Sequence, residues 1–277
     1  MENKLTSEIN AKIASILTYQ KNKILKHPKK PLILISTGAY CPPHKVHIQN
    51  FKICKKQIKT HNLILCLISP SHDSYSSSKN SYPWNLPLKT RLNLLNSIIK
   101  EENEENFIIA DTWEGEQKYF IDFPSVFKSR GDEIKEIAKQ ILGIDIDFGF
   151  VMGADLVIRT YCMKVMTKIG ILVVVNRPDW DNKLVLEMKE KLEKENKDNV
   201  IFIYPEENDF CDAMSSTKIR ELFDEKKFDD VMKYTSKECV QILEKENNNL
   251  QNERNKNESI IQNNKKDFEN LKNNMIN

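Results

Sequence analysis

The sequence predicts an α/β fold: a doubly wound parallel sheet of about six strands, with an extra N-terminal helix and a C-terminal tail. Six apolar runs alternate with stretches in which apolar residues recur at helical spacing. These runs are continuous, as expected for strands that are buried on both faces of a sheet. With 277 residues, 40% of them apolar, the chain is long enough for one substantial domain.

The elements follow one another in a regular order. Residues 4–24 show helical spacing, and KHPKKP at 26–31 ends this helix before the first strand. The expected strands are 31–36, 63–69, 106–110, 147–152, 170–175 and 200–204. The expected helices between and after them are about 44–58, 87–100, 123–142, 155–168, 183–195 and 216–249. Such alternation places helices on both faces of the sheet.

Three segments are expected along the chain. Residues 1–30 form an N-terminal helical extension, residues 31–245 form the domain, and residues 246–277 form an Asn/Lys-rich tail without Gly or Pro. We expect the tail to be disordered or marginally helical. Its Ile261, Phe268 and Met275 lie seven residues apart, so the alternative is a coiled-coil segment that would join copies of the chain in a homo-oligomer.

Composition excludes several classes of protein. Forty-two basic and 40 acidic residues give a formal charge of +2, and no strong basic patch suggests a nucleic-acid partner. No apolar run approaches the length of a membrane span, and no signal peptide is evident. Six cysteines without a CxxC pair indicate reduced thiols and no zinc site. We therefore expect an intracellular protein, cytoplasmic or nuclear, without nucleic-acid or membrane partners.

The stretch STGAYCPPHKVH, residues 36–47, lies at the carboxyl end of the first expected strand, where parallel sheets bind ligands. Gly38 permits a tight turn and the close approach of a ligand. Pro43 suits the first turn of a helix. His44 and His47 would then share one face near a helix N-terminus that favours anions. This pattern suggests a phosphate cradle; the alternatives are metal ligands or ordinary surface side chains.

A second stretch, SSTKIR at 215–220, follows the last expected strand. One of its three hydroxyl residues can cap a helix. Lys218 and Arg220 then fall in the first turn, where each positive charge opposes the helix dipole at a cost of roughly 0.3–1 kcal/mol. A bound phosphate would reverse the sign of that interaction. The alternative is an ordinary cap with exposed basic residues.

Together the two stretches resemble the paired signatures of the nucleotidylyltransferase family, GxFxPxHxxH and ISSTxxR, in the same order. Four further stretches resemble loops of the eukaryotic nicotinamide/nicotinate mononucleotide adenylyltransferases: ISPSHDSY at 68–75, DTWE at 111–114, GADL at 153–156 and VVVNR at 173–177. The resemblance covers about residues 31–245. It implies a Rossmann-like sheet of the nucleotidylyltransferase type.

Roles for single residues follow from the resemblance by position. The catalytic residues it implies are His47, His44 and Arg220. The ATP-binding residues it implies are Gly38, Ala39, Tyr40, Gly153, Asp155, Ser216, Thr217 and Lys218. The mononucleotide-binding residues it implies are Trp113, which would stack on the pyridine ring, Glu114, Arg177 and Lys79. No protein metal ligand is implied, and Mg²⁺ is expected to accompany ATP.

Local patterns leave other roles open for three of these residues. Trp113 would also suit core packing, Asp155 a helix N-cap and Arg177 a surface loop. The sequence also departs from the family pattern at three places. Cys41 replaces an expected Asn, the serines at 76–78 replace an expected Lys and leave Lys79 as the nearest candidate, and the region after GADL offers Tyr161 in place of a Trp.

The function implied by the resemblance is adenylyl transfer from ATP to nicotinamide or nicotinate mononucleotide. The products would be NAD, or its deamido form, and pyrophosphate. One alternative is a nucleotidylyltransferase that acts on another phosphate, such as a pantetheine or sugar-alcohol phosphate. A second is a catalytically impaired nucleotide-binding homologue, and a third is an unrelated α/β domain whose tail carries the function.

Overall fold

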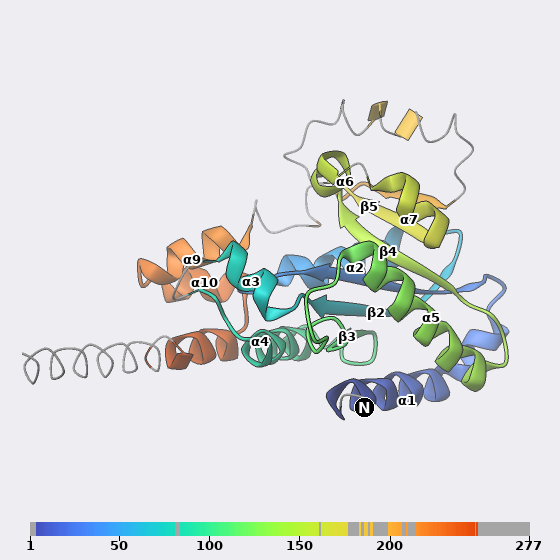
Figure 1. The fold of residues 1–277 in the computed structure, drawn as a ribbon, viewed down its shortest axis with the longest axis horizontal. Coiled ribbons are helices and arrows are strands. Elements are labelled where there is room, and N and C mark those ends of the chain that lie inside the picture. The colour runs from blue at the N-terminus through green and yellow to red at the C-terminus, as the bar shows by residue number, and fades with distance from the viewer. Residues whose placement is uncertain are drawn as a thin grey trace, which may run out of the picture.

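A six-stranded sheet forms the centre of the computed structural model, which describes residues 4–80, 84–160, 162–176, 199–206 and 214–246 and a few isolated positions between 183 and 248 (Figure 1). The strand order is β3-β2-β1-β4-β5-β6, and all neighbouring strands are parallel. The strands are β1 (Pro31–Gly38), β2 (Asn62–Pro70), β3 (Ile108–Ala110), β4 (Asp147–Gly153), β5 (Ile171–Val175) and β6 (Val200–Ile203). The predicted α/β class and strand number are confirmed.

The strand order reverses between β1 and β4, and the carboxyl ends of these strands define the crevice where such sheets bind ligands. The helices are α1 (Lys4–Lys26), α2 (Lys45–Gln57), α3 (Asp73–Lys79), α4 (Leu88–Glu101), α5 (Phe123–Leu142), α6 (Ala154–Thr160), α7 (Met163–Ile169), α9 (Ser216–Asp224) and α10 (Phe228–Tyr234). Residues 237–246 are also helical.

Three helix predictions need correction. The helix expected over 155–168 is two helices, α6 and α7. The helix expected over 216–249 is interrupted at 225–226 and 235–236, where the backbone leaves helical geometry. The sequence has no Gly or Pro there that would predict a break. Residues 73–79, expected in a loop, form α3. Most of the helix expected over 183–195, and nearly all of the predicted tail, lie outside the described residues.

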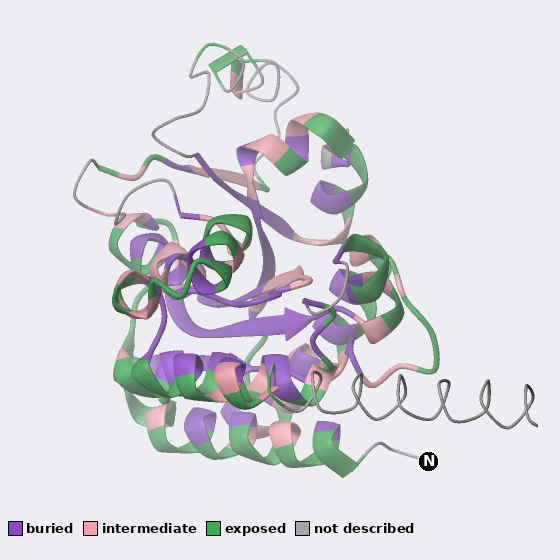
Figure 2. Ribbon diagram, turned by 90° about the vertical axis from the view of Figure 1, so that its left-hand side faces the viewer, coloured by how far each residue is buried: buried purple, intermediate pink, exposed green. Residues whose placement is uncertain are grey.

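Both faces of the sheet are covered by apolar clusters, as Figure 2 shows by the buried strands beneath partly exposed helices. Leu32 and Leu34 of β1 point into a cluster that is completed mainly by α2, α4 and α9. Ile33 and Ile35 point into the other cluster, which α1, α5 and α7 complete. The alternation follows from the two-residue period of a strand, so the two-sided burial explains the continuous apolar runs.

The described cysteines are all buried and free: Cys41, Cys54, Cys66, Cys162 and Cys239. Burial raises the pKa of each of these thiols and keeps it protonated near neutral pH. Cys211 lies outside the described residues. Among the helices that the structure describes, none combines the length and apolar character needed to cross a bilayer.

Candidate functional site

The turn between β1 and α2 is held by an aromatic side chain. Tyr40 adopts φ 45, a left-handed conformation, and its ring packs over Gly38 at 3.5 Å from where a Cβ would stand. The Tyr40 hydroxyl lies 2.9 Å from Ser36 Oγ, and burial raises its pKa. These contacts hold the Tyr40 side chain against the carboxyl end of β1.

The two histidines of this turn contact each other. His44 is the N-cap of α2, with extended backbone at φ −148, and its backbone N–H donates to His47 Nδ1 at 3.0 Å. Their ring centroids are 3.7 Å apart, and the edge of the Tyr40 ring packs against His47 at 4.7 Å. Because Nδ1 accepts a hydrogen bond, the neutral His47 ring carries its proton on Nε2. That tautomer makes Nε2 a hydrogen-bond donor, as a phosphate oxygen requires.

The second motif joins the first directly, although about 170 residues separate them in the chain. Ser216 Oγ donates to the Pro42 carbonyl at 2.8 Å. Arg220 Nη1 donates to the Cys41 carbonyl at 2.8 Å, and its Nη2 donates to Thr217 Oγ1 at 3.0 Å. The first turn of α9 and the turn before α2 therefore form one unit, and the Arg220 guanidinium is held at their junction.

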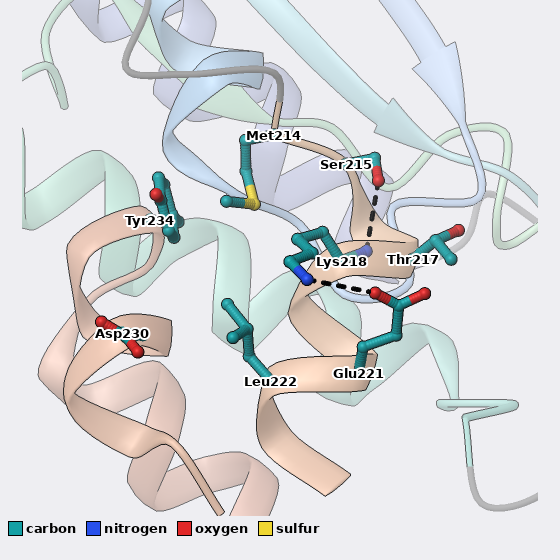
Figure 3. A pocket seen from close by; sticks show the side chains of 8 residues that line it. All are labelled: Met214, Ser215, Thr217, Lys218, Glu221, Leu222, Asp230 and Tyr234. Atoms are coloured by element: carbon teal, nitrogen blue, oxygen red, sulfur yellow. Dashed lines mark hydrogen bonds and ion pairs between the residues drawn. The ribbon is translucent and has the colours of Figure 1, made fainter. Parts of the chain in front are cut away.

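The helix cap of the second motif is Ser215, whose Oγ accepts from the Lys218 N–H at 3.2 Å. A cavity of about 490 Å³ opens on this side of α9, toward α10 (Figure 3). Lys218 lines the cavity and pairs with Glu221 at 3.4 Å. Since residues two apart on a helix point about 160° apart, Lys218 and Arg220 serve different faces of α9. Lys218 and Arg220 are therefore close in the sequence but point away from each other in the structure.

The loop after β3 contains two buried carboxyl groups. One of them forms an ion pair with an arginine of α5, and the other has no cation bonded to it in the part of the chain that the structure describes. Asp111 is fully buried and receives two bonds from Arg130, at 2.7 and 3.1 Å. Glu114 is 1% exposed, and burial raises its pKa from 4.5 to about 8, an effect that a hydrogen bond from Ser71 only partly offsets. The carboxyl of Glu114 is therefore mostly neutral at pH 7.

Trp113 lies between these two acidic residues and is half-buried, packing against the apolar cluster on the α1 and α5 side. Its carbonyl accepts from Gln117 Nε2 at 2.8 Å. The core-packing interpretation therefore accounts for part of the ring. The remaining exposed part leaves a planar surface at the ligand side of the sheet.

Arg91 of α4 is a site residue that the sequence analysis missed. It is fully buried, and its guanidinium donates to the carbonyls of Leu86, Ala39 and Ser71 and to Asp73 Oδ1, over 2.6 to 3.1 Å. It thus ties the turn after β1 to the loop after β2. The available signal was an arginine on the apolar stripe of the expected helix 87–100, three and four residues before Leu94 and Leu95.

Other predicted residues have their own local partners. Asp155 pairs with Arg159 one turn further along α6. Its Oδ1 lies 2.6 Å from where a Cβ of Gly153 would stand, so a larger residue at 153 would displace the Asp155 carboxylate. Lys79 Nζ sits 4.5 Å from the centre of the Tyr75 ring. Arg177 lies outside the described residues.

Metal coordination by the two histidines finds no support in the part of the chain that the structure describes. No group of three or more His, Cys, Asp or Glu side chains is placed there to hold a metal ion. Structural zinc sites take four such ligands, and catalytic ones take three. His44 and His47 contact each other, and His47 also contacts Tyr40.

Comparison with known proteins gives a family match and matches to solved structures. The family model for cytidylyltransferase-like proteins matches residues 35–222, a span that contains both motifs. A solved structure from Vibrio parahaemolyticus, provisionally named a nicotinate-nucleotide adenylyltransferase, is similar with a TM-score of 0.42 and 19% identity. The similarity covers 77% of this chain and 91% of that one. The comparison with curated proteins gave no match.

Proposed function

Because the chain belongs to the cytidylyltransferase-like family, we propose that it transfers an adenylyl group from ATP to nicotinamide or nicotinate mononucleotide. The 5′-phosphate of the mononucleotide attacks the α-phosphorus of ATP, the bond to the bridging oxygen breaks, and pyrophosphate leaves. The observation that carries the proposal is the direct contact between the two motifs, Arg220 to Cys41 and Ser216 to Pro42. It supports one phosphate site built from both.

For this reaction the protein must position the two substrates and stabilise the negative charge that develops on the phosphates. A phosphate monoester is already an adequate nucleophile, so no covalent enzyme intermediate is needed. Two anions must be brought together, and negative charge on the leaving oxygens must be stabilised. His47 supplies an Nε2–H donor, Arg220 supplies a fixed cation, and the N-termini of α2 and α9 supply backbone donors.

The acceptor side rests on the loop after β3. In this proposal Trp113 stacks on the pyridine through the exposed part of its ring, and the mostly neutral Glu114 in the same loop adds no repulsion against an anionic substrate near pH 7. The stretches ISPSHDSY and DTWE support a pyridine mononucleotide over other phosphates.

Magnesium is proposed to enter with the polyphosphate. Mg²⁺ is usually held by phosphate oxygens, waters and at most one or two carboxylates. When bound, the ion would screen the charge of the phosphates. The protein's own groups, His47 and Arg220, would still orient the reacting phosphate.

The test is a coupled assay with ATP, Mg²⁺ and each mononucleotide in turn, in which an added dehydrogenase reports the dinucleotide. We expect product, and we expect His47→Ala to lower kcat about 10²–10³-fold, because it removes a donor aimed at developing charge. His27→Ala is the matched control, since His27 is exposed and its side chain accepts a hydrogen bond from the Lys29 N–H, far from both motifs in the chain. Unchanged turnover in His47→Ala, or ATP binding without product in the unmodified protein, would overturn the proposal.

A further inference from the structure

The first helix is bonded to the loop that carries Trp113. The Thr6 N–H and hydroxyl both donate to Glu116 Oε2, at 3.0 and 2.7 Å. The same hydroxyl lies 3.4 Å from Thr112 Oγ1. Thr6 and Thr112 are both buried. The negative charge of this carboxylate also interacts favourably with the positive end of the α1 dipole, so the contact stabilises both the helix and the loop.

A second connection reaches the start of the same loop through α5. Asn10 donates to Glu133 at 2.6 Å and accepts from Arg130 Nη1 at 2.8 Å. Arg130 in turn holds Asp111 with two bonds. Asn10 therefore bonds to the same guanidinium group, that of Arg130, that binds Asp111. The loop segment 111–116 is tied to α1 at both of its ends, on either side of Trp113.

The helix that makes these contacts is itself rigidly placed. Ile13 and Leu17 are fully buried in the cluster on the α1 and α5 side of the sheet, three and seven residues after Asn10. The family match begins at residue 35, so α1 lies outside it. An element from outside the matched span thus holds the loop that faces the candidate mononucleotide site.

From these contacts we propose that Thr6 and Asn10 are positioning residues for the mononucleotide. They hold the 111–116 loop so that the Trp113 ring is preorganised before substrate binds. The inference rests on the proposed function for its choice of substrate. Neither residue touches the substrate in this account. Their loss would leave the loop to be ordered at the moment of binding, which weakens affinity without changing the reacting groups.

Steady-state kinetics test the proposal with a matched pair of variants. Thr6→Val keeps the shape of the side chain but removes the hydroxyl donor to Glu116. Thr18→Val makes the same change on the same helix, where the exposed hydroxyl bonds only to Ala14 of its own helix. We expect Thr6→Val to raise KM for the mononucleotide about three- to tenfold. KM for ATP and kcat should match those of Thr18→Val.

A measurement without substrate separates this inference from the proposed function. Hydrogen exchange of the 111–117 backbone should be faster in Thr6→Val than in Thr18→Val, and the combination of Thr6→Val with Glu116→Gln should add little. If no substrate is turned over but exchange accelerates, the positioning role stands and the proposed reaction fails. Equal exchange in the two valine variants, or a rise in both KM values together, would overturn the positioning role.

Discussion

At the scale of single residues, Glu114 shows how the fold changes the charge of a side chain. Its carboxyl is buried, and its pKa rises from 4.5 to about 8. The folded protein therefore keeps a proton that the unfolded chain releases between these two values. By linkage, the free energy of unfolding falls as pH rises through this window and levels off above it.

Glu114→Gln should remove this pH dependence, because the amide is similar in size and never ionises. We expect the variant to lose less stability than the unmodified protein between pH 5 and pH 8, and to be the more stable of the two at about pH 8.5. Denaturant titrations at three pH values would measure this. Glu105→Gln is the control, since Glu105 is exposed and should leave the profile unchanged. Parallel curves for Glu114→Gln and the unmodified protein would contradict the expectation.

Sequence alone could identify only some of the residues at the site. His47, Ser216 and Arg220 stand in motifs whose spacing places them at strand and helix ends, and the structure brings those motifs together. The position of Arg91 on an apolar helical stripe was a weak signal, and Thr6 carries no local signal, because the partners of both residues are far away in the chain. Their roles are set by tertiary contacts that no local pattern encodes.

At the scale of elements, the turn between α9 and α10 shows why helix ends were harder to predict than helix positions. The Lys227 N–H bonds to the Leu222 carbonyl and the Lys226 N–H to the Phe223 carbonyl, which is a Schellman motif. Lys226 takes the left-handed position, at φ 58, where glycine is usual. With neither Gly nor Pro between 216 and 249, the apolar spacing indicated one continuous helix.

Lys226→Gly should therefore stabilise the protein. A residue with a Cβ is strained in the left-handed region, and replacing it with glycine should raise the free energy of unfolding by about 1 kcal/mol. Lys233→Gly is the opposite control: it lies on the exposed side of α10, within the helix, and should cost about 1 kcal/mol. Thermal unfolding of the two variants would show shifts of opposite sign. A loss of stability in Lys226→Gly would refute the assignment of strain.

At the scale of the whole molecule, the sheet separates two cores, and α1 belongs to one of them. The class of fold was predictable because continuous apolar runs require helices on both faces. Strand order was not predictable, since it depends on which way each connection crosses the sheet. The packing of α1 on the domain was also not predictable, because an apolar stripe on a helix has the same sequence pattern whether it packs on its own core or on a neighbouring chain.

Leu17→Ala tests whether α1 is integral to the domain. Leu17 is fully buried, and truncating it should lower the free energy of unfolding by about 2–5 kcal/mol. Leu25→Ala is the matched control, because Leu25 is 43% exposed on the same helix and should change stability little. Urea titration of both variants measures the difference. A cost below about 1 kcal/mol for Leu17→Ala would mean that α1 is only an appendage.

The buried thiols can report on local opening of the structure. Five cysteines are distributed over the turn after β1, α2, β2, the start of α7 and the last helical segment, and burial keeps each of them protonated. A thiol reagent attacks the exposed thiolate, so each site can be alkylated only when its own element opens. The order in which the five are modified would chart local opening across both cores, with no label introduced into the chain.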